Sequence, residues 1–296
     1  QNYFLSEINP HKVMHKSQFL ILVALLIFST LSAKSQELYS QNFDDFSDGT
    51  TDLGDGSIIT GQAAEIIGGR LQLTKDGQEL GFSSWTIPPI EGSSAGFKIT
   101  FDYEIYDGPG NGNPADGFSV NYGDAQMGEL GLAEEGMNSS RATENISFEV
   151  DTYEIGNASS DPGVNISGLA NGLDLEQLAY NKGPILNDGQ RVEGKIEIMW
   201  QPDVGATFTT TGMETNADFT EVKIPDFIPN DDHTFIFSAR VGGAHQDLFI
   251  DNLVIQTGLF DDDEDEDNLP DFYENAQVAN LTDLNGLGDG PGPGTG

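Results

Sequence analysis

The chain of 296 residues contains no cysteine, only two tryptophans and only 12 lysines and arginines. Without cysteine there is no disulfide framework, so stability must come from a hydrophobic core, and the length allows one large β domain of about 200 to 250 residues. The few basic residues face 49 aspartates and glutamates, which gives a formal net charge of −37. A field of this sign repels nucleic acids and anionic membrane surfaces, and we expect no nucleic-acid partner.

The excess of carboxylates suits a protein that works where divalent cations are plentiful. Calcium prefers oxygen ligands and can neutralise clustered carboxylates. A merely soluble, acidic surface is the alternative, and composition does not decide between the two.

An apolar run near the N-terminus predicts an export signal. After Lys12 and Lys16, residues 19–28 (FLILVALLIF) carry no charge, and small residues follow up to Ala33. This apolar core is too short for an ordinary membrane span. We therefore expect a signal peptide at residues 14–36, no membrane span after its removal, and residues 1–13 as upstream sequence outside the product. The protein is then expected to be secreted or to lie at the cell surface.

Alternating side chains in the middle of the chain predict antiparallel strands. Phe97, Ile99, Phe101 and Tyr103 share one face, and the residues between them are polar or charged. Shorter runs of the same kind occur at residues 118–122, 148–150, 196–200, 235–237 and 248–250. Gly, Asn, Asp and Pro separate these runs, as is typical of turns between strands. The pattern predicts an all-β sandwich of two antiparallel sheets over residues 37–258.

Residues 148–168 (FEVDTYEIGNASSDPGVNISG) contain most of the candidate chemistry. When the apolar residues 148 and 150 face the core, the carboxylates at 149 and 151 lie together on the opposite face. The loop that follows contributes further oxygen ligands, so that carboxylate, amide and carbonyl oxygens can surround one hard cation such as calcium. The candidate ligands are Glu149, Asp151, the Tyr153 carbonyl, Asn157 and Asp161. A solvated strand face followed by an Asx-rich turn is the alternative.

Several motifs along the chain occur in an order that resembles a known family. They are GRLQLT (69–74), SWTIPPI (84–90), PADGF (114–118), GELGL (128–132), EVDTY (149–153) and DP (161–162). Over residues 57–256 their order and approximate spacing resemble the legume-type (L-type) lectins, members of the concanavalin A-like lectin/glucanase superfamily. The resemblance implies a concanavalin A-like jelly roll that binds a glycan or polysaccharide with the help of calcium.

By position, the resemblance also implies roles for individual residues. Asp116, after a cis Ala115–Asp116 peptide bond, would accept hydrogen bonds from sugar hydroxyls, and the Gly128 N–H would donate to the same sugar. The implied sugar-site residues are Asp116, Gly128, Tyr153 and Asn157. The implied calcium ligands are Asp151, the Tyr153 carbonyl, Asn157 and Asp161.

The resemblance gives weaker support to a second metal site, which would hold a transition metal. It would be faced by Glu149, Asp151 and Asp161, but this chain has Asn165 where the family usually places a metal-binding His. Asn is a poor ligand for such metals. The loop between Tyr153 and Asp161 also differs in length from the plant pattern, so sugar specificity cannot be carried over.

Two other functions remain open. Residues 149–154 (EVDTYE) also match the E-x-D-x-x-E signature of laminarinase-like glycoside hydrolases, in which Glu149 would be the nucleophile, Asp151 its helper and Glu154 the general acid. Two tryptophans are few for the aromatic cleft of such an enzyme. A structural adhesion or surface-matrix module with a degenerate sugar site is the third class. We predict a carbohydrate-binding protein and not an enzyme.

A second calcium-binding pattern follows the β domain at residues 259–274. Acidic residues occupy loop positions one, three, five, nine and twelve: Asp263, Asp265, Asp267, Asp271 and Glu274. This is the EF-hand-like order, similar to thrombospondin type 3 repeats, although Asn268 replaces the usual Gly. An acidic linker is the alternative. Residues 275–296 read as a Gly/Pro-rich linker, after which further domains are expected.

The histidines within the β domain carry no catalytic pattern. His233 and His245 have no nucleophile partner and no metal-ligand spacing in the sequence. We expect both on the surface or at a sheet edge.

Overall fold

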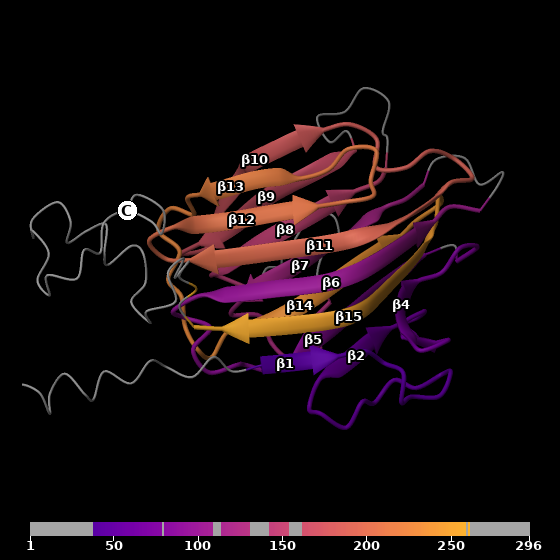
Figure 1. Ribbon diagram of the computed structural model, residues 1–296, viewed down its shortest axis with the longest axis horizontal. Helices are drawn as coiled ribbons and strands as arrows, with labels where there is room; N and C mark the ends of the chain where they lie inside the picture. The colour runs from indigo at the N-terminus through magenta and orange to yellow at the C-terminus, as the bar shows by residue number, and fades with distance from the viewer. Residues whose placement is uncertain are drawn as a thin grey trace, which may run out of the picture. The chain divides into compact units, whose positions relative to one another are not determined.

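Two antiparallel β-sheets make up the described part of the chain in a computed structural model (Figure 1). The structure describes residues 38–78, 80–108, 114–130, 142–153, 162–258 and 260. The predicted signal peptide, acidic calcium loop and linker lie outside these residues. Within them, no helix has the length and apolarity that a membrane crossing requires.

Sheet A has eight strands in the order β13-β12-β11-β6-β15-β4-β3, and β1 pairs with β15. Its strands are β1 (Leu38–Gln41), β3 (Glu65–Ile67), β4 (Arg70–Thr74), β6 (Phe97–Tyr106), β11 (Arg191–Gln201), β12 (Gly205–Thr210), β13 (Asp218–Val222) and β15 (Asp247–Thr257). The long strands β6, β11 and β15 form its centre, where β6 pairs with both of the others.

Sheet B has seven strands in the order β10-β9-β8-β7-β14-β5-β2, and Figure 1 shows it as the layer behind sheet A. Its strands are β2 (Ile58–Gly61), β5 (Gly81–Ile87), β7 (Gly117–Gly123), β8 (Asn145–Asp151), β9 (Gly163–Ala170), β10 (Leu173–Lys182) and β14 (Thr234–Val241). Neighbours in the sheet are distant in the chain, because β14 lies between β5 and β7.

The hydrophobic core lies between the inner faces of the two sheets. Phe97 of sheet A packs against Tyr122 and Phe235 of sheet B, with ring centroids 4.8 and 5.2 Å apart. Both tryptophans, Trp85 and Trp200, are buried in the same core. The alternation of apolar and polar residues thus supplies one continuous core from two sheets.

The predicted all-β sandwich of two antiparallel sheets is confirmed. The alternating run at Phe97–Tyr103 lies in β6, and the shorter runs lie in β7, β8, β11, β14 and β15. The surface position predicted for His233 is wrong. The residue is 5% exposed, and its ring packs near those of Tyr122 and Phe227, with centroid distances of 5.3 and 5.8 Å.

Candidate functional site

Asp116 lies immediately before β7, and the Ala115–Asp116 peptide bond is cis, as the family resemblance implied. Its backbone is held from two sides. The Asp116 N–H donates to the Arg240 carbonyl of β14 at 3.0 Å, and its carbonyl accepts the N–H of Thr152, after β8, at 3.0 Å. The position of Asp116 is therefore determined by both neighbours of β7 in sheet B.

The side chain of Asp116 is held by Arg240, a residue that the sequence motifs did not single out. Arg240 Nε donates to Asp116 Oδ2 at 2.9 Å. Alternation along β14 places Arg240 on the face opposite the core, because Ala239 faces inward, and this signal could have found it. The Asp116 carboxylate is 12% exposed, and its Oδ1 has no hydrogen-bond partner among the described residues. That oxygen remains available to accept a hydroxyl group.

The structure brings Asp116 next to the end of β8, 35 positions later in the chain. Gly117 pairs with Asp151 across the β7–β8 ladder, and the bond from Thr152 to Asp116 continues it. Asp151 Oδ1 accepts the N–H of Tyr153 at 2.9 Å, which forms a tight turn at this point. The predicted sugar ligand and two predicted calcium-binding residues thus lie at the same end of the paired strands β7 and β8.

Three predicted residues of this region lie outside the described residues: Asn157, Asp161 and Glu154. The donors that are described, the Asp151 carboxylate and the Tyr153 carbonyl, are hard oxygens of the kind that calcium takes. In the described part of the chain, no group of three or more His, Cys, Asp or Glu side chains is gathered for a metal ion.

Gly128 does not lie beside Asp116 in this structure. Its N–H donates to Thr86 Oγ1 of β5 at 3.3 Å, and a side chain at this position would contact Ile58 of β2. Two strand spacings separate β5 from β7, and with strands about 4.8 Å apart this is roughly 10 Å across the sheet. The structure thus places Gly128 at β5 and Asp116 at β7, and a shared sugar, which the resemblance implied, would have to span the distance between them.

Glu149 is buried and has both carboxylate oxygens engaged by β9. Asn165 Nδ2 donates to Oε2 at 2.6 Å, and Ser167 Oγ donates to Oε1. Burial raises the pKa of Glu149 to about 7, although both hydrogen bonds act in the opposite direction. These residues do not fit a transition metal, because two protein donors hold the oxygens that a metal would need.

Small polar side chains cover the face of sheet B opposite the core. Asn145 donates to Ser147, Ser147 to Asn121, and Asn121 to Ser119. All four residues are at most 1% exposed. Because both tryptophans lie in the core, neither lines this face as the aromatic cleft of a laminarinase-like hydrolase would require.

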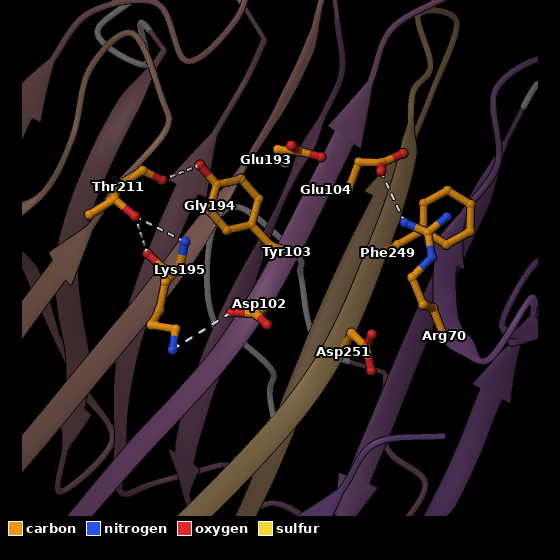
Figure 2. A pocket seen from close by; sticks show the side chains of 10 residues that line it. All are labelled: Arg70, Asp102, Tyr103, Glu104, Glu193, Gly194, Lys195, Thr211, Phe249 and Asp251. Atoms are coloured by element: carbon orange, nitrogen blue, oxygen red, sulfur yellow. Dashed lines mark hydrogen bonds and ion pairs between the residues drawn. The ribbon is translucent and has the colours of Figure 1, made fainter. Parts of the chain in front are cut away.

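A separate hollow of about 430 Å³ lies on the outer face of sheet A, away from all predicted site residues (Figure 2). Its charged lining consists of Arg70, Lys195, Asp102, Glu104, Glu193 and Asp251. Arg70 pairs with Glu104 at 3.0 Å and covers the Phe249 ring, with Cζ 4.1 Å from the ring centroid. Lys195 lies 3.9 Å from Asp102, so both basic groups of this hollow already have a carboxylate partner.

Comparison with known proteins supports the fold through structure and not through sequence. No protein-family model and no curated protein sequence matches the chain. Peanut lectin, solved with a nine-residue peptide, is 18% identical with a TM-score of 0.54, covering 76% of this chain and 100% of that one. Lectin I from Ulex europaeus, solved with the methyl glycoside of α-L-fucose, is 16% identical with a TM-score of 0.54, covering 75% and 98%.

The exoplasmic/lumenal domain of VIP36, in its Ca2+/Man-bound form, is a third similar structure. It is 14% identical with a TM-score of 0.52, and the match covers 69% of this chain and 85% of that domain. At these identities the comparison establishes the fold alone, a sandwich like that of the legume lectins.

Proposed function

We propose that this protein is a secreted, calcium-dependent carbohydrate-binding protein that recognises a glycan or polysaccharide. The observation that carries the proposal is that Asp116 lies beside Asp151 and Tyr153 at one end of the paired strands β7 and β8. Asp116 would accept sugar hydroxyls through Oδ1 while Arg240 holds its other oxygen. Among proteins of similar fold, the Ulex lectin was solved with a fucose glycoside and VIP36 with Ca2+ and Man.

Calcium would be held by Asp151 and the Tyr153 carbonyl, with Asn157 and Asp161 as the remaining ligands. Its chemistry there is to neutralise carboxylates and to order the loop that follows β8. We propose no transition metal at Glu149. Secretion rests on the signal pattern at residues 14–36, and residues 259–274 are proposed as a second, calcium-stiffened segment.

The hydrolase alternative has less support. A nucleophilic Glu149 would have to attack with oxygens that Asn165 and Ser167 already hold. A substrate would also have to reach Glu149, which is only 5% exposed. Binding without hydrolysis is therefore the function that the geometry supports better.

The test is glycan-array binding of the full chain, with calcium and again with a chelator. Binding that disappears with the chelator is expected. Asp116→Asn keeps the shape of the side chain but removes its charge and is expected to abolish binding. Asp203→Asn, on an exposed turn, is the matched control and should bind as the wild type does.

Two results would contradict the proposal. Undiminished binding by Asp116→Asn would exclude the proposed sugar site. Silence of the wild type in both conditions would favour the adhesion module, and release of sugar from a polysaccharide would favour the hydrolase.

A further inference from the structure

Asp107, at the end of the sandwich where β6 leaves sheet A, has a buried carboxylate that the proposed sugar site does not use. Its residue exposure is 0%, and Oδ2 accepts the N–H of Gly189 at 3.1 Å. The other oxygen, Oδ1, has no hydrogen-bond partner among the described residues. A buried carboxylate oxygen left in this state is costly unless a cation or a proton compensates it.

Gln246 also has buried polar atoms without hydrogen-bond partners among the described residues, and it lies opposite Asp107. Tyr106 pairs with Asp247, so Asp107 and Gln246 are the next residues of the two strands. Both continue the inward-facing series of their strands, which directs their side chains into the same end of the sandwich. Gln246 is fully buried, and neither its Oε1 nor its Nε2 has a partner within the described residues.

Thr74 of β4 adds a third unpaired group on this side of sheet A. It pairs with Leu248, two positions along β15 from Gln246. Thr74 is 1% exposed, and its Oγ1 also has no partner in the part of the chain that is described. Hydroxyl and amide oxygens are ligands that calcium accepts together with carboxylates.

The charges around Asp107 are negative. Burial raises its pKa to about 6, and the charges of Asp188 and Asp76 add to this increase. Asp188 directly precedes Gly189, whose N–H donates to Asp107 Oδ2, so the Asp188 carboxylate lies near Asp107. Two basic groups near this end are engaged by other carboxylates: His245 Nδ1 lies 2.6 Å from Asp76, and Arg191 pairs with Glu104 at 3.5 Å.

We propose that a calcium ion binds at this end of the sandwich, held by Asp107 Oδ1, the Asp188 carboxylate and the Gln246 amide oxygen. A divalent cation neutralises both carboxylates and uses the buried oxygens that the protein leaves unpaired. The site uses two carboxylates together with neutral oxygens. The described residues contain no group of three or more His, Cys, Asp or Glu side chains placed for a metal ion, and the proposed site does not require one.

The proposed ion lies at the start of the chain segment that ends at Asp116. Asp107 follows β6 directly, and Asp116 precedes β7. A cation at Asp107 would hold the first residue of this connection while Arg240 and Thr152 hold the last. The inference does not depend on sugar binding, because calcium stoichiometry tests it separately.

The test counts the calcium ions bound per full chain by isothermal titration calorimetry after treatment with a chelator. Asp107→Asn preserves the shape of the side chain and is expected to bind one ion fewer than the wild type. Asp151→Asn should also lose one ion, and the double variant two, if the sites are separate. Asp203→Asn is the control and should keep the full number.

An unchanged number of ions and unchanged affinity in Asp107→Asn would overturn the proposal. The space would then hold only water. If near-ultraviolet circular dichroism shows that Asp107→Asn is unfolded, Asp188→Asn and Gln246→Leu decide the question. Asp188 is exposed, so its replacement should not affect folding. Each is expected to weaken the binding of the same ion, and wild-type binding by both would overturn the proposal equally.

Discussion

At the scale of single residues, Trp85 is the largest fully buried side chain of the described part. Its ring centroid lies 5.3 Å from those of Phe43 and Phe237. Its Nε1 has no hydrogen-bond partner among the described residues. Trp85 therefore stabilises the core by packing, while its buried N–H reduces this gain.

Replacing Trp85 should separate these two effects. Trp85→Ala is expected to lower the free energy of unfolding by about 3–5 kcal/mol, because it leaves a large cavity. Trp85→Phe keeps a ring in place and removes the unpaired donor, so its loss should be much smaller. Denaturant unfolding followed by circular dichroism measures both, and equal losses would contradict the account.

His233 gives a prediction for the pH dependence of stability. Burial lowers its pKa below the ordinary value, and the carboxylates of Asp124, Glu144 and Asp232 only partly oppose this. The unfolded chain therefore takes up a proton near pH 6.5 that the folded chain does not bind. The stability associated with this group is present above about pH 6.5 and falls as the pH drops below it.

The measurement is urea unfolding between about pH 8 and pH 5, where His titrates before most carboxylates. His233→Gln cannot take up this proton and is expected to lose less stability than the wild type over that range. Parallel losses in the two proteins would show that other groups cause the pH dependence.

At the scale of elements, the β8–β9 pair holds the buried Glu149. Asn165 lies directly opposite Glu149 in the ladder, and its amide donates to Oε2 at 2.6 Å. Ser167 donates to the other oxygen from the same strand. The charge of Glu149 therefore depends on two side chains of one neighbouring strand.

Asn165→Ala should lower the free energy of unfolding by about 1–3 kcal/mol, because it leaves a buried carboxylate oxygen without its donor. Asn181→Ala in β10 is the matched control. Its amide donates at 2.9 Å to the Asn216 carbonyl in an exposed hydrogen bond. The control should lose only about 0.5–1.5 kcal/mol. Equal losses of unfolding free energy in the two variants would show that the hydrogen bond to Glu149 stabilises the fold no more than an exposed one does.

At the scale of the whole molecule, the core residues all lie within the β domain. All buried core residues of the described part lie between Phe43 and Ile255. The last described contact is the bond from Gln201 Nε2 to the Phe260 carbonyl at 2.7 Å. Residues 37–260 should therefore contain everything that the sandwich needs to fold.

A fragment of residues 37–260 is expected to unfold in one cooperative transition, with a midpoint within a few degrees of the full chain. Thermal unfolding at matched salt and calcium concentration checks this, because a strongly acidic chain repels itself more at low ionic strength. A broad transition or a much lower midpoint would show that residues outside this range stabilise the domain.

The period-two alternation was enough to predict the class of the fold. Phe97, Ile99, Phe101 and Tyr103 lie inward on β6, because successive side chains of a strand point to opposite faces whatever the partner strand is. The same rule placed Glu149 and Asp151 on one face of β8. Strand identity and side-chain direction are local properties and can be predicted from the sequence.

Other features depend on which strands become neighbours. Asp116 is bonded by Arg240, 124 positions later, only because β14 lies between β5 and β7. Asn165 holds Glu149 only in the observed register of β8 and β9. No local pattern contains this information, because the pairing of distant strands is decided by packing of the whole sandwich.

The sequence by itself therefore determined an acidic, cysteine-free β-sandwich with its carboxylates grouped after one strand, since composition and alternation act locally. The tertiary structure decided that Asp116 lies beside Asp151, that Gly128 lies apart from both, that Glu149 is held by amide and hydroxyl donors, and that Asp107 is buried opposite Gln246. Each of these outcomes joins residues far apart in the chain, and their physical cause is the strand order of the two sheets.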